Sequence, residues 1–202
     1  MNKIKKILIG TNNAGKYREI CDLLPKEIEK YSPKDFNLAT PEETGKNFKE
    51  NSFLKAAYFS KKTNLICLSD DSGLEIDILK GKPGIYSSRW SGKEKNFDLG
   101  IEKIFREINK INKDWKNNNK AQFVCWMTLF LPQGKSFNSG GIIKGSISQT
   151  KKGKNGFGYD PIFIPDGYNQ TFGEMQPKLK ISIDHRSIAF SKLKKFFFNI
   201  PL

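Results

Sequence analysis

The sequence predicts a fold of the α/β class, with strands and helices interleaved along one chain. Apolar runs of strand length occupy residues 5–10, 65–71 and 121–131. Apolar residues at helical spacing occupy residues 14–24, 97–111 and 187–198. Because the two kinds of element mix and the middle of the chain is rich in strands, the class is α/β or α+β.

The chain begins with a predicted strand-turn-helix unit. The strand at residues 5–10 runs through a turn at Gly10–Asn13 into a helix from Ala14 to Leu24, which Pro25 ends. Residues 28–36 are ambiguous and hold a candidate second strand.

A long helix is predicted within residues 40–64. It opens on the acidic pair Glu42 and Glu43, which the helix dipole favours at that end. Residues 65–71 and 73–79 are then predicted as two successive strands, separated near Gly73.

The second half of the chain is predicted to contain more strand. A loop rich in glycine, proline and serine covers residues 80–92, and residues 113–120 form a polar connector that we expect to be the least ordered segment. One face of the strand at 121–131 carries Ala121, Phe123, Cys125, Met127 and Leu129. The remaining predicted elements are strands within 140–150 and 161–165 and a closing helix at 187–198.

The composition is strongly basic. Lysine and arginine outnumber aspartate and glutamate by 35 to 21, a formal net charge of +14. Such a surplus points to a nucleic acid, an anionic surface or a polyanionic small substrate, or to a solvated lysine-rich surface with no partner. The lysines are scattered and form no arginine-rich arm, so a nucleic-acid partner is the secondary hypothesis.

Cysteine usage and hydropathy indicate the compartment. The three cysteines are widely spaced and form no Cys-x-x-Cys pair, so we expect buried free thiols and no zinc site. The N-terminal apolar segment is too short for a signal peptide, and the longest apolar stretch, residues 123–131, is too short to span a membrane. We therefore expect a cytoplasmic protein with no membrane partner.

Residues 7–17, ILIGTNNAGKY, nearly spell a phosphate-binding P-loop. Gly10, Gly15 and Lys16 fit the pattern G-x-x-x-x-G-K, but Tyr17 stands where a P-loop needs serine or threonine for Mg²⁺. A strand-turn-helix with a lysine here can still direct backbone N–H groups and a cation at a phosphate. The alternative is an ordinary structural turn.

Asp70 and Asp71 lie together where an apolar strand ends. Successive side chains on a strand point to opposite faces, so one carboxylate should reach into a site while the other braces the loop. A carboxylate at this point can hold Mg²⁺ or activate water, and Glu42 or Glu43 would complete a site for a hard cation. Turn-forming and helix-capping roles are the alternatives.

Two C-terminal stretches suit a nucleobase. In GKNGFGYD, glycines flank Phe157, which predicts a ring open to stacking on both faces, and Asp160 can accept a hydrogen bond from a base edge. His185 and Arg186 form a pair of donors near Lys180, which favours a 6-oxo purine over adenine. A core aromatic beside a turn and a structural histidine are the alternatives.

Six stretches in chain order resemble the inosine triphosphate pyrophosphatase family: TNNAGKYRE, EETGKNFKENSFLKA, SDDSGLEID, GKPGIYSSR, FGYDPIF and DHR. The resemblance implies one domain over residues 1–202, an elongated mixed sheet with two lobes around a central cleft, and a homodimer. It implies a Mg²⁺-dependent hydrolase, with Mn²⁺ as the alternative ion. Such an enzyme converts ITP, dITP and XTP to the monophosphate and pyrophosphate, cleanses the nucleotide pool and binds no nucleic acid.

The resemblance also implies roles for individual residues. Asp71 would be the catalytic base and would hold the metal with Glu42, and Lys16 would be a catalytic cation. The implied substrate-binding residues are Thr11, Asn12, Asn13, Ala14, Gly15, Lys16, Lys55, Ser72, Arg89, Phe157, Gly158, Tyr159, Asp160, Lys180, His185 and Arg186. Asp184 departs from the family, which usually has serine before the His-Arg pair, so base selectivity stays open.

Three other functions compete with this one. A P-loop kinase or NTPase would release the γ-phosphoryl group, but the Tyr17 hydroxyl is too far from the turn to reach Mg²⁺. A nucleic-acid-binding protein would carry clustered aromatic residues along a basic stripe. A pyrophosphatase for pyrimidine or methylated nucleotides would not need the donor pair His185–Arg186.

Overall fold

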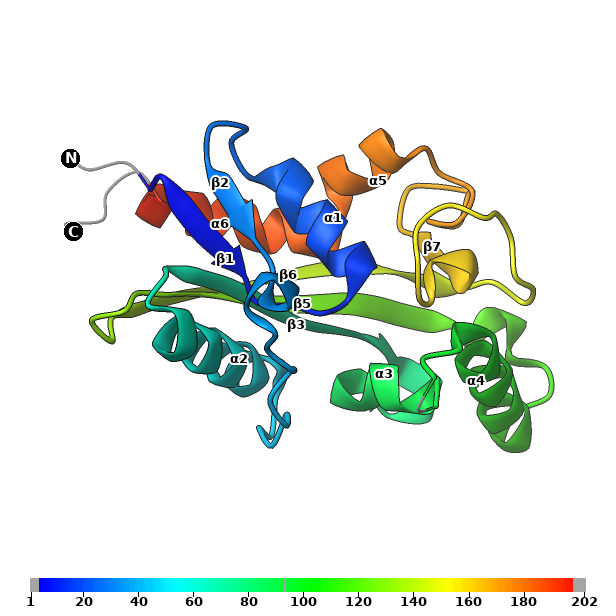
Figure 1. Cartoon of the computed structure of the whole chain (residues 1–202). Helices are drawn as coiled ribbons and strands as arrows, with labels where there is room; N and C mark the ends of the chain where they lie inside the picture. The colour runs from blue at the N-terminus through cyan, green and yellow to red at the C-terminus, as the bar shows by residue number, and fades with distance from the viewer. Residues whose placement is uncertain (1–3, 93, 198–202) are drawn as a thin grey trace. The chain divides into compact units, whose positions relative to one another are not determined.

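A computed structural model describes residues 4–92 and 94–197, and its strands form one mixed sheet (Figure 1). The strands are β1 (Lys6–Ile9), β2 (Glu29–Tyr31), β3 (Cys67–Ile76), β4 (Lys82–Pro83), β5 (Lys120–Phe130), β6 (Ser136–Ile147) and β7 (Phe163–Pro165). Their hydrogen-bonded order is β2-β1-β3-β5-β6-β7, with β4 paired to β3. Strand β1 pairs in parallel with β2 and β3, whereas the β3–β4 and β6–β7 pairs are antiparallel.

Helices follow or precede most of these strands, which confirms the α/β class. The α-helices are α1 (Ala14–Leu23), α2 (Phe48–Thr63), α3 (Ser87–Trp90), α4 (Phe97–Ile111), α5 (Pro177–Ile183) and α6 (His185–Phe197). Short 3₁₀ helices are η1 (Pro33–Phe36), η2 (Asp77–Leu79), η3 (Gly84–Tyr86), η4 (Trp115–Asn117) and η5 (Asp160–Ile162). None of the helices in the described ranges is long and apolar enough to cross a membrane.

The chain divides into two compact units, and each has its own apolar core. Unit 1 comprises the residues up to Asp71, Cys125–Gly141 and those from His185 onward. Unit 2 comprises Ser72–Val124 and Ile142–Asp184. The backbone therefore passes between the units four times, and three of these passages lie within strands β3, β5 and β6.

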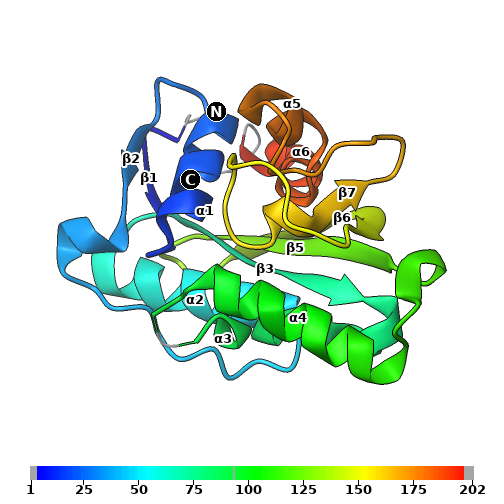
Figure 2. The same ribbon diagram turned by 90° about the vertical axis from the view of Figure 1, so that its right-hand side faces the viewer.

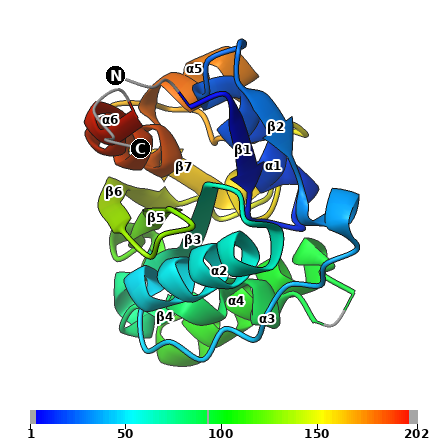
Figure 3. The same ribbon diagram turned by 60° about the vertical axis from the view of Figure 1, so that its left-hand side comes forward.

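Unit 1 is built by the alternation of side chains along its strands. On β1, Ile7 and Ile9 join the cluster formed with α1 and α6, whereas Leu8 joins Ala56 and Phe59 of α2. Figures 1 and 3 accordingly show α2 on one side of the sheet and α1 with α6 on the other. On β5, Cys125, Met127 and Leu129 share the α1–α6 cluster, which confirms the predicted apolar face of that strand.

Unit 2 is built around helix α4. Ile101, Ile104 and Ile108 lie on one face of this helix and pack with Leu74 and Ile76 of β3. Figure 2 shows α4 beside α3, below β3.

The polar connector at residues 113–120 contains the short helix η4 and a buried aromatic residue. Its Trp115 is buried in the core of unit 2, and the indole Nε1–H donates to Asn109 Oδ1 at 3.0 Å. One aromatic residue within a polar run thus attaches the segment to the core of unit 2.

Two further predictions from the sequence are wrong. Residues 65–71 and 73–79 do not form two strands, because β3 runs unbroken from Cys67 to Ile76 and is buried on both faces for most of its length. Glu42 and Glu43 do not open the long helix, which begins at Phe48 with Asn47 as its N-cap. The amide of Asn47 supplies the acceptor for the first turn, so the acidic pair is left in the preceding loop.

Several short helices and one short strand were not predicted from the sequence. Residues 80–92 contain β4, η3 and α3, and helix α5 was not predicted. Both segments are short, so sequence periodicity has too few turns to identify them.

We expect Gly141 to be required for the packing of α6 against β6. A Cβ atom at this position would lie 2.1 Å from the carbonyl oxygen of His185 and 2.4 Å from the nitrogen of Ala189. Both are backbone atoms, so neither can rotate away, and Gly141→Ala should lower the free energy of unfolding by about 1–3 kcal/mol or more. Urea denaturation followed by circular dichroism measures the change.

Asn138→Ala, at an exposed position on the same strand, is the control and should change stability by less than about 0.5 kcal/mol. If the two variants were equally stable, β6 and α6 would be able to move apart around the added methyl group without a loss of folding free energy.

Candidate functional site

The predicted phosphate-binding turn is a capped helix start. Strand β1 ends at Ile9, and the Asn13 side chain accepts hydrogen bonds from the backbone nitrogens of Gly15 and Lys16, at 2.9 and 3.1 Å. Thr11 Oγ1 in turn accepts from Asn13 N at 3.2 Å. The Asn13 side chain thus already accepts from two of the backbone N–H groups that were expected to face a phosphate. The role of these N–H groups in binding stays a prediction.

Lys16 contacts a fully buried carboxylate. Its Nζ lies 3.2 Å from Oδ2 of Asp70, and the same oxygen is 3.3 Å from the NH2 nitrogen of Arg186. Arg186 also pairs with Glu19 of α1. Burial alone would raise the pKa of Asp70, but attraction to Lys16, Arg186 and Lys55 outweighs it and holds the pKa well below its usual range. Asp70 is therefore an ionised brace between α1, β3 and α6.

Asp71 makes a different set of contacts on the other side of β3. Its Oδ2 accepts from Asn51 Nδ2 at 3.2 Å, and its Oδ1 lies 3.2 Å from Lys55 Nζ. Burial raises the pKa of Asp71 above its ordinary value, although Lys55 and Lys16 oppose this. For Lys55, burial acts to lower the pKa, but attraction to Asp71 and Glu43 prevails and raises it, so this lysine is charged.

Helix α2 supplies both partners of Asp71. Asn51 and Lys55 are four residues apart, which places them on one face of the helix. Asn51 Oδ1 also accepts from Gly45 N at 2.8 Å, and thereby anchors the loop that carries Glu42 and Glu43. One amide side chain thus links that loop to Asp71.

The acidic loop presents Glu43, not Glu42, to this network. Glu43 is half-buried and pairs with Lys55, whereas Glu42 is exposed. Burial alone would raise the pKa of Glu43, but Lys55 lowers it overall. Among residues 4–92 and 94–197, no group of three or more histidine, cysteine, aspartate or glutamate side chains is placed to hold a metal. The metal-binding role of Glu42 stays a prediction.

Unit 2 holds some of the residues predicted to contact the base, whereas His185 and Arg186 belong to unit 1. Phe157 N donates to Asp160 Oδ2 at 2.7 Å, and Lys180 Nζ lies 2.5 Å from the same oxygen. The Lys180 ammonium is also 5.0 Å from the centre of the Phe157 ring and 5.4 Å from that of Phe172. The prediction that Phe157 is open on both faces is therefore wrong, because Lys180 covers one of them.

Tyr159 makes structural contacts in this unit, and its role in substrate binding stays a prediction. Its ring is buried against Phe97 at a centroid distance of 5.3 Å, and its hydroxyl donates to the Ser87 carbonyl oxygen at 2.8 Å. Burial raises the pKa of Tyr159. Arg89 is exposed, and its guanidinium carbon lies 5.0 Å from the centre of the Tyr86 ring.

The predicted residues thus fall into two groups, one in each unit. Unit 1 holds Thr11, Asn12, Asn13, Ala14, Gly15, Lys16, Glu42, Lys55, Asp71, His185 and Arg186. Unit 2 holds Ser72, Arg89, Phe157, Gly158, Tyr159, Asp160 and Lys180. Asn51 and Glu19 were missed, and of the two loop acids that the sequence offered, Glu43 joins the network. The spacing of Asn51 and Lys55, and of Lys16 and Glu19 in α1, is the helical signal that could have found Asn51 and Glu19.

Known proteins resemble the whole chain. The model of the Ham1 family matches residues 7–196. A dITP/XTP pyrophosphatase of Bacillus cereus is 39% identical over 199 residues, which cover 96% of each chain. Another, of Christiangramia forsetii, is 40% identical and covers 95% of this chain and 98% of its own.

Solved structures agree with the sequence relatives. A HAM1 protein from Coxiella burnetii is 33% identical and superposes with a TM-score of 0.85, covering 96% of this chain and 99% of its own. The resemblance inferred from six short stretches is thereby confirmed. With a family model and solved relatives that match it almost from end to end, the chain belongs to the Ham1 family.

Proposed function

We propose that this protein hydrolyses dITP, ITP and XTP to the nucleoside monophosphate and pyrophosphate. The observation that carries the proposal is the buried pair Asp70 and Asp71, because each contacts a different lysine on a different side of one strand. Relatives that share about two residues in five with the chain are named dITP/XTP pyrophosphatases. They do not support a P-loop kinase or a nucleic-acid-binding protein.

The reaction we propose is attack of water on the α-phosphorus. Asp71 accepts a proton from the water as its oxygen bonds to phosphorus, and the bond from the α-phosphorus to the oxygen that bridges to the β-phosphate breaks. Pyrophosphate leaves with the electrons of that bond. Lys16 and Lys55 offset the negative charge of the triphosphate. The raised pKa of Asp71 suits a general base, because it brings the carboxylate closer to the working pH.

We propose Mg²⁺ as the cofactor, with Mn²⁺ as the alternative. The donor set fits a hard cation, because Asp71 and Glu43 both direct carboxylate oxygens at the Lys55 ammonium. Asp71 and a carboxylate of the 42–43 loop would hold the ion, which would supply charge neutralisation for the phosphates.

Tyr17 supports this assignment over a P-loop mechanism. Its ring packs against the apolar cluster of unit 1, and burial is the main cause that raises its pKa to about 12. A side chain in that position is core structure and not a metal ligand. We further propose a cytoplasmic homodimer that binds its nucleotide substrate and no nucleic acid.

A product assay over a panel of nucleotides tests the proposed reaction. With Mg²⁺ present, dITP, ITP and XTP should give monophosphate and pyrophosphate, resolved by anion-exchange chromatography, while ATP should react poorly. Removal of the metal with EDTA should abolish turnover, and added Mg²⁺ should restore it. Diphosphate and orthophosphate as products, or no hydrolysis of any 6-oxo purine, would refute the function.

Asp71→Asn should lower kcat by about 10²–10⁴-fold, because an amide cannot accept the proton. Nucleotide binding, measured by calorimetry with a non-hydrolysable analogue, should persist. Thermal stability should fall because Lys55 loses a buried partner, but the fold should be retained because Glu43 still pairs with Lys55. Asp77→Asn is the matched control, since Asp77 is exposed and follows the same strand. If Asp71→Asn keeps near-normal turnover, Asp71 is not the base.

We assign Asn51 as a positioning residue for Asp71. Asn51→Ala removes a hydrogen bond to a carboxylate that is worth about 1.5–3 kcal/mol, so kcat/KM should fall by about ten- to a hundredfold. Ser52→Ala is the control, because Ser52 is also buried on α2 but bonds Thr128 instead. It should lower stability without the fall in kcat/KM. A loss of kcat/KM equal in both variants would mean that Asn51 acts only through the stability of the helix.

A further inference from the structure

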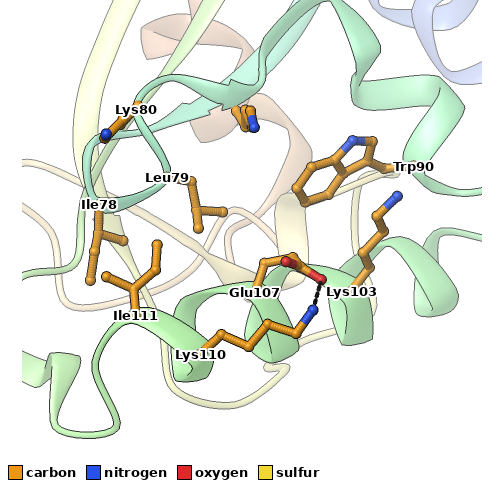
Figure 4. Close-up of a pocket in the computed structure, with 9 residues that line it drawn as sticks. Ile78, Leu79, Lys80, Trp90, Lys103, Glu107, Lys110 and Ile111 are labelled. Carbon is orange, nitrogen blue, oxygen red and sulfur yellow. Dashed lines mark hydrogen bonds and ion pairs between the residues drawn. The ribbon is translucent and has the colours of Figure 1, made fainter.

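Unit 2 contains a pocket of about 390 Å³ that none of the predicted site residues line (Figure 4). Three segments border it, namely η2 with the following turn and β4, helix α3, and helix α4. The lining residues are Ile78, Leu79, Lys80, Lys82, Trp90, Lys103, Glu107, Lys110 and Ile111. The volume lies at the lower end of the range for small-molecule sites, which is about 300–1,000 Å³.

The pocket is strongly basic. Four lysines line it, against the single carboxylate of Glu107, which pairs with Lys110 at 2.9 Å. No ion pair is described for Lys80 or Lys82 in the part of the chain that the structure covers, and both are exposed. These two ammonium groups are therefore available to an anion, and the lysines of α4 add to the same positive field.

The turn that carries Lys80 and Lys82 begins with left-handed backbone. Lys80 adopts a φ of 54°, in the left-handed region that glycine and asparagine favour, and Gly81 follows at 82°. Lys80 is the C-cap of η2, a position at which the left-handed conformation is common. Here the backbone turn puts lysines two residues apart at one rim of the pocket.

The rest of the wall is apolar. Trp90 points across the pocket towards Leu79, with Ile78 and Ile111 beyond it (Figure 4). Lys103 Nζ lies 4.6 Å from the centre of the Trp90 ring, so a cation–π contact holds the indole in place. An indole beside aliphatic side chains is a surface on which a flat ring can stack.

We propose that this pocket binds a purine nucleoside monophosphate, as a second nucleotide site separate from the residues assigned to hydrolysis. The base would lie against Trp90 and Leu79, and the phosphate would contact Lys80 and Lys82. A doubly charged phosphate matches two adjacent ammonium groups better than a carboxylate does. The pocket also offers one acceptor, Glu107, to an N–H group of the base.

Nuclear magnetic resonance can detect this site directly. The chain has three tryptophans, so the indole N–H signal of Trp90 is identified by its loss in Trp90→Phe. The probes are inosine monophosphate, inosine and inorganic phosphate. We expect inosine monophosphate to shift the Trp90 signal in a saturable manner and at lower concentration than either fragment.

The double variant Lys80→Ala/Lys82→Ala should weaken this binding by about tenfold or more, because two charge-assisted contacts are lost. Lys61→Ala/Lys62→Ala is the matched control, since it removes the same charge from exposed positions on α2 and should leave the Kd within about twofold. Hydrolysis should persist in both variants, which separates this test from that of the proposed function.

Three outcomes would overturn the proposal. The Trp90 signal could fail to move, or phosphate alone could bind as tightly as the nucleotide. The shift could also persist in Lys80→Ala/Lys82→Ala and vanish in Lys16→Ala, which would place the nucleotide in unit 1 only.

Discussion

The burial of the Asp70 carboxylate is the constraint on which unit 1 depends. A charge taken out of water must be paired, and removing one partner of a buried pair costs about 3–5 kcal/mol. Asp70 is fully buried and contacts Lys16 of α1 and Arg186 of α6. Its charge can be satisfied only when both helices lie against β3. The same contacts therefore fix the fold and hold Lys16 where a phosphate could reach it.

Adjacent positions on β3 carry carboxylates with opposite properties. Asp70 meets two cations through one oxygen, and its pKa falls. Asp71 shares Lys55 with Glu43, so attraction to cations offsets less of the effect of burial on its carboxylate. The pKa of Asp71 therefore rises. Strand alternation sends the first towards α1 and α6 and the second towards α2. Two neighbouring aspartates thus differ in role: Asp70 stays ionised, and Asp71 is able to take up a proton.

The sequence predicted the features that depend on local chemistry. The turn before α1, the alternating face of β5 and the opposed directions of Asp70 and Asp71 all follow from patterns within a few residues. The extent of β3 was missed because Gly73 suggested a break, whereas the strand runs through this buried glycine without interruption. Asn51 was missed because its value lies in a contact with a residue far along the chain, and spacing alone does not decide between Glu43 and Glu42.

The distribution of lysines shows where the excess positive charge acts. Lys16, Lys55 and Lys180 each contact a buried carboxylate, so these sites are close to neutral before any ligand binds. The net charge of +14 must therefore come from lysines elsewhere, most of them exposed. Exposed charges guide a polyanion at long range, whereas paired buried lysines hold fixed positions and can exchange a carboxylate for a phosphate. Different lysines thus attract the polyanion from a distance and contact it in the site. An exposed cluster such as that around Lys80 and Lys82 can therefore bind its own ligand without disturbing the buried ion pairs.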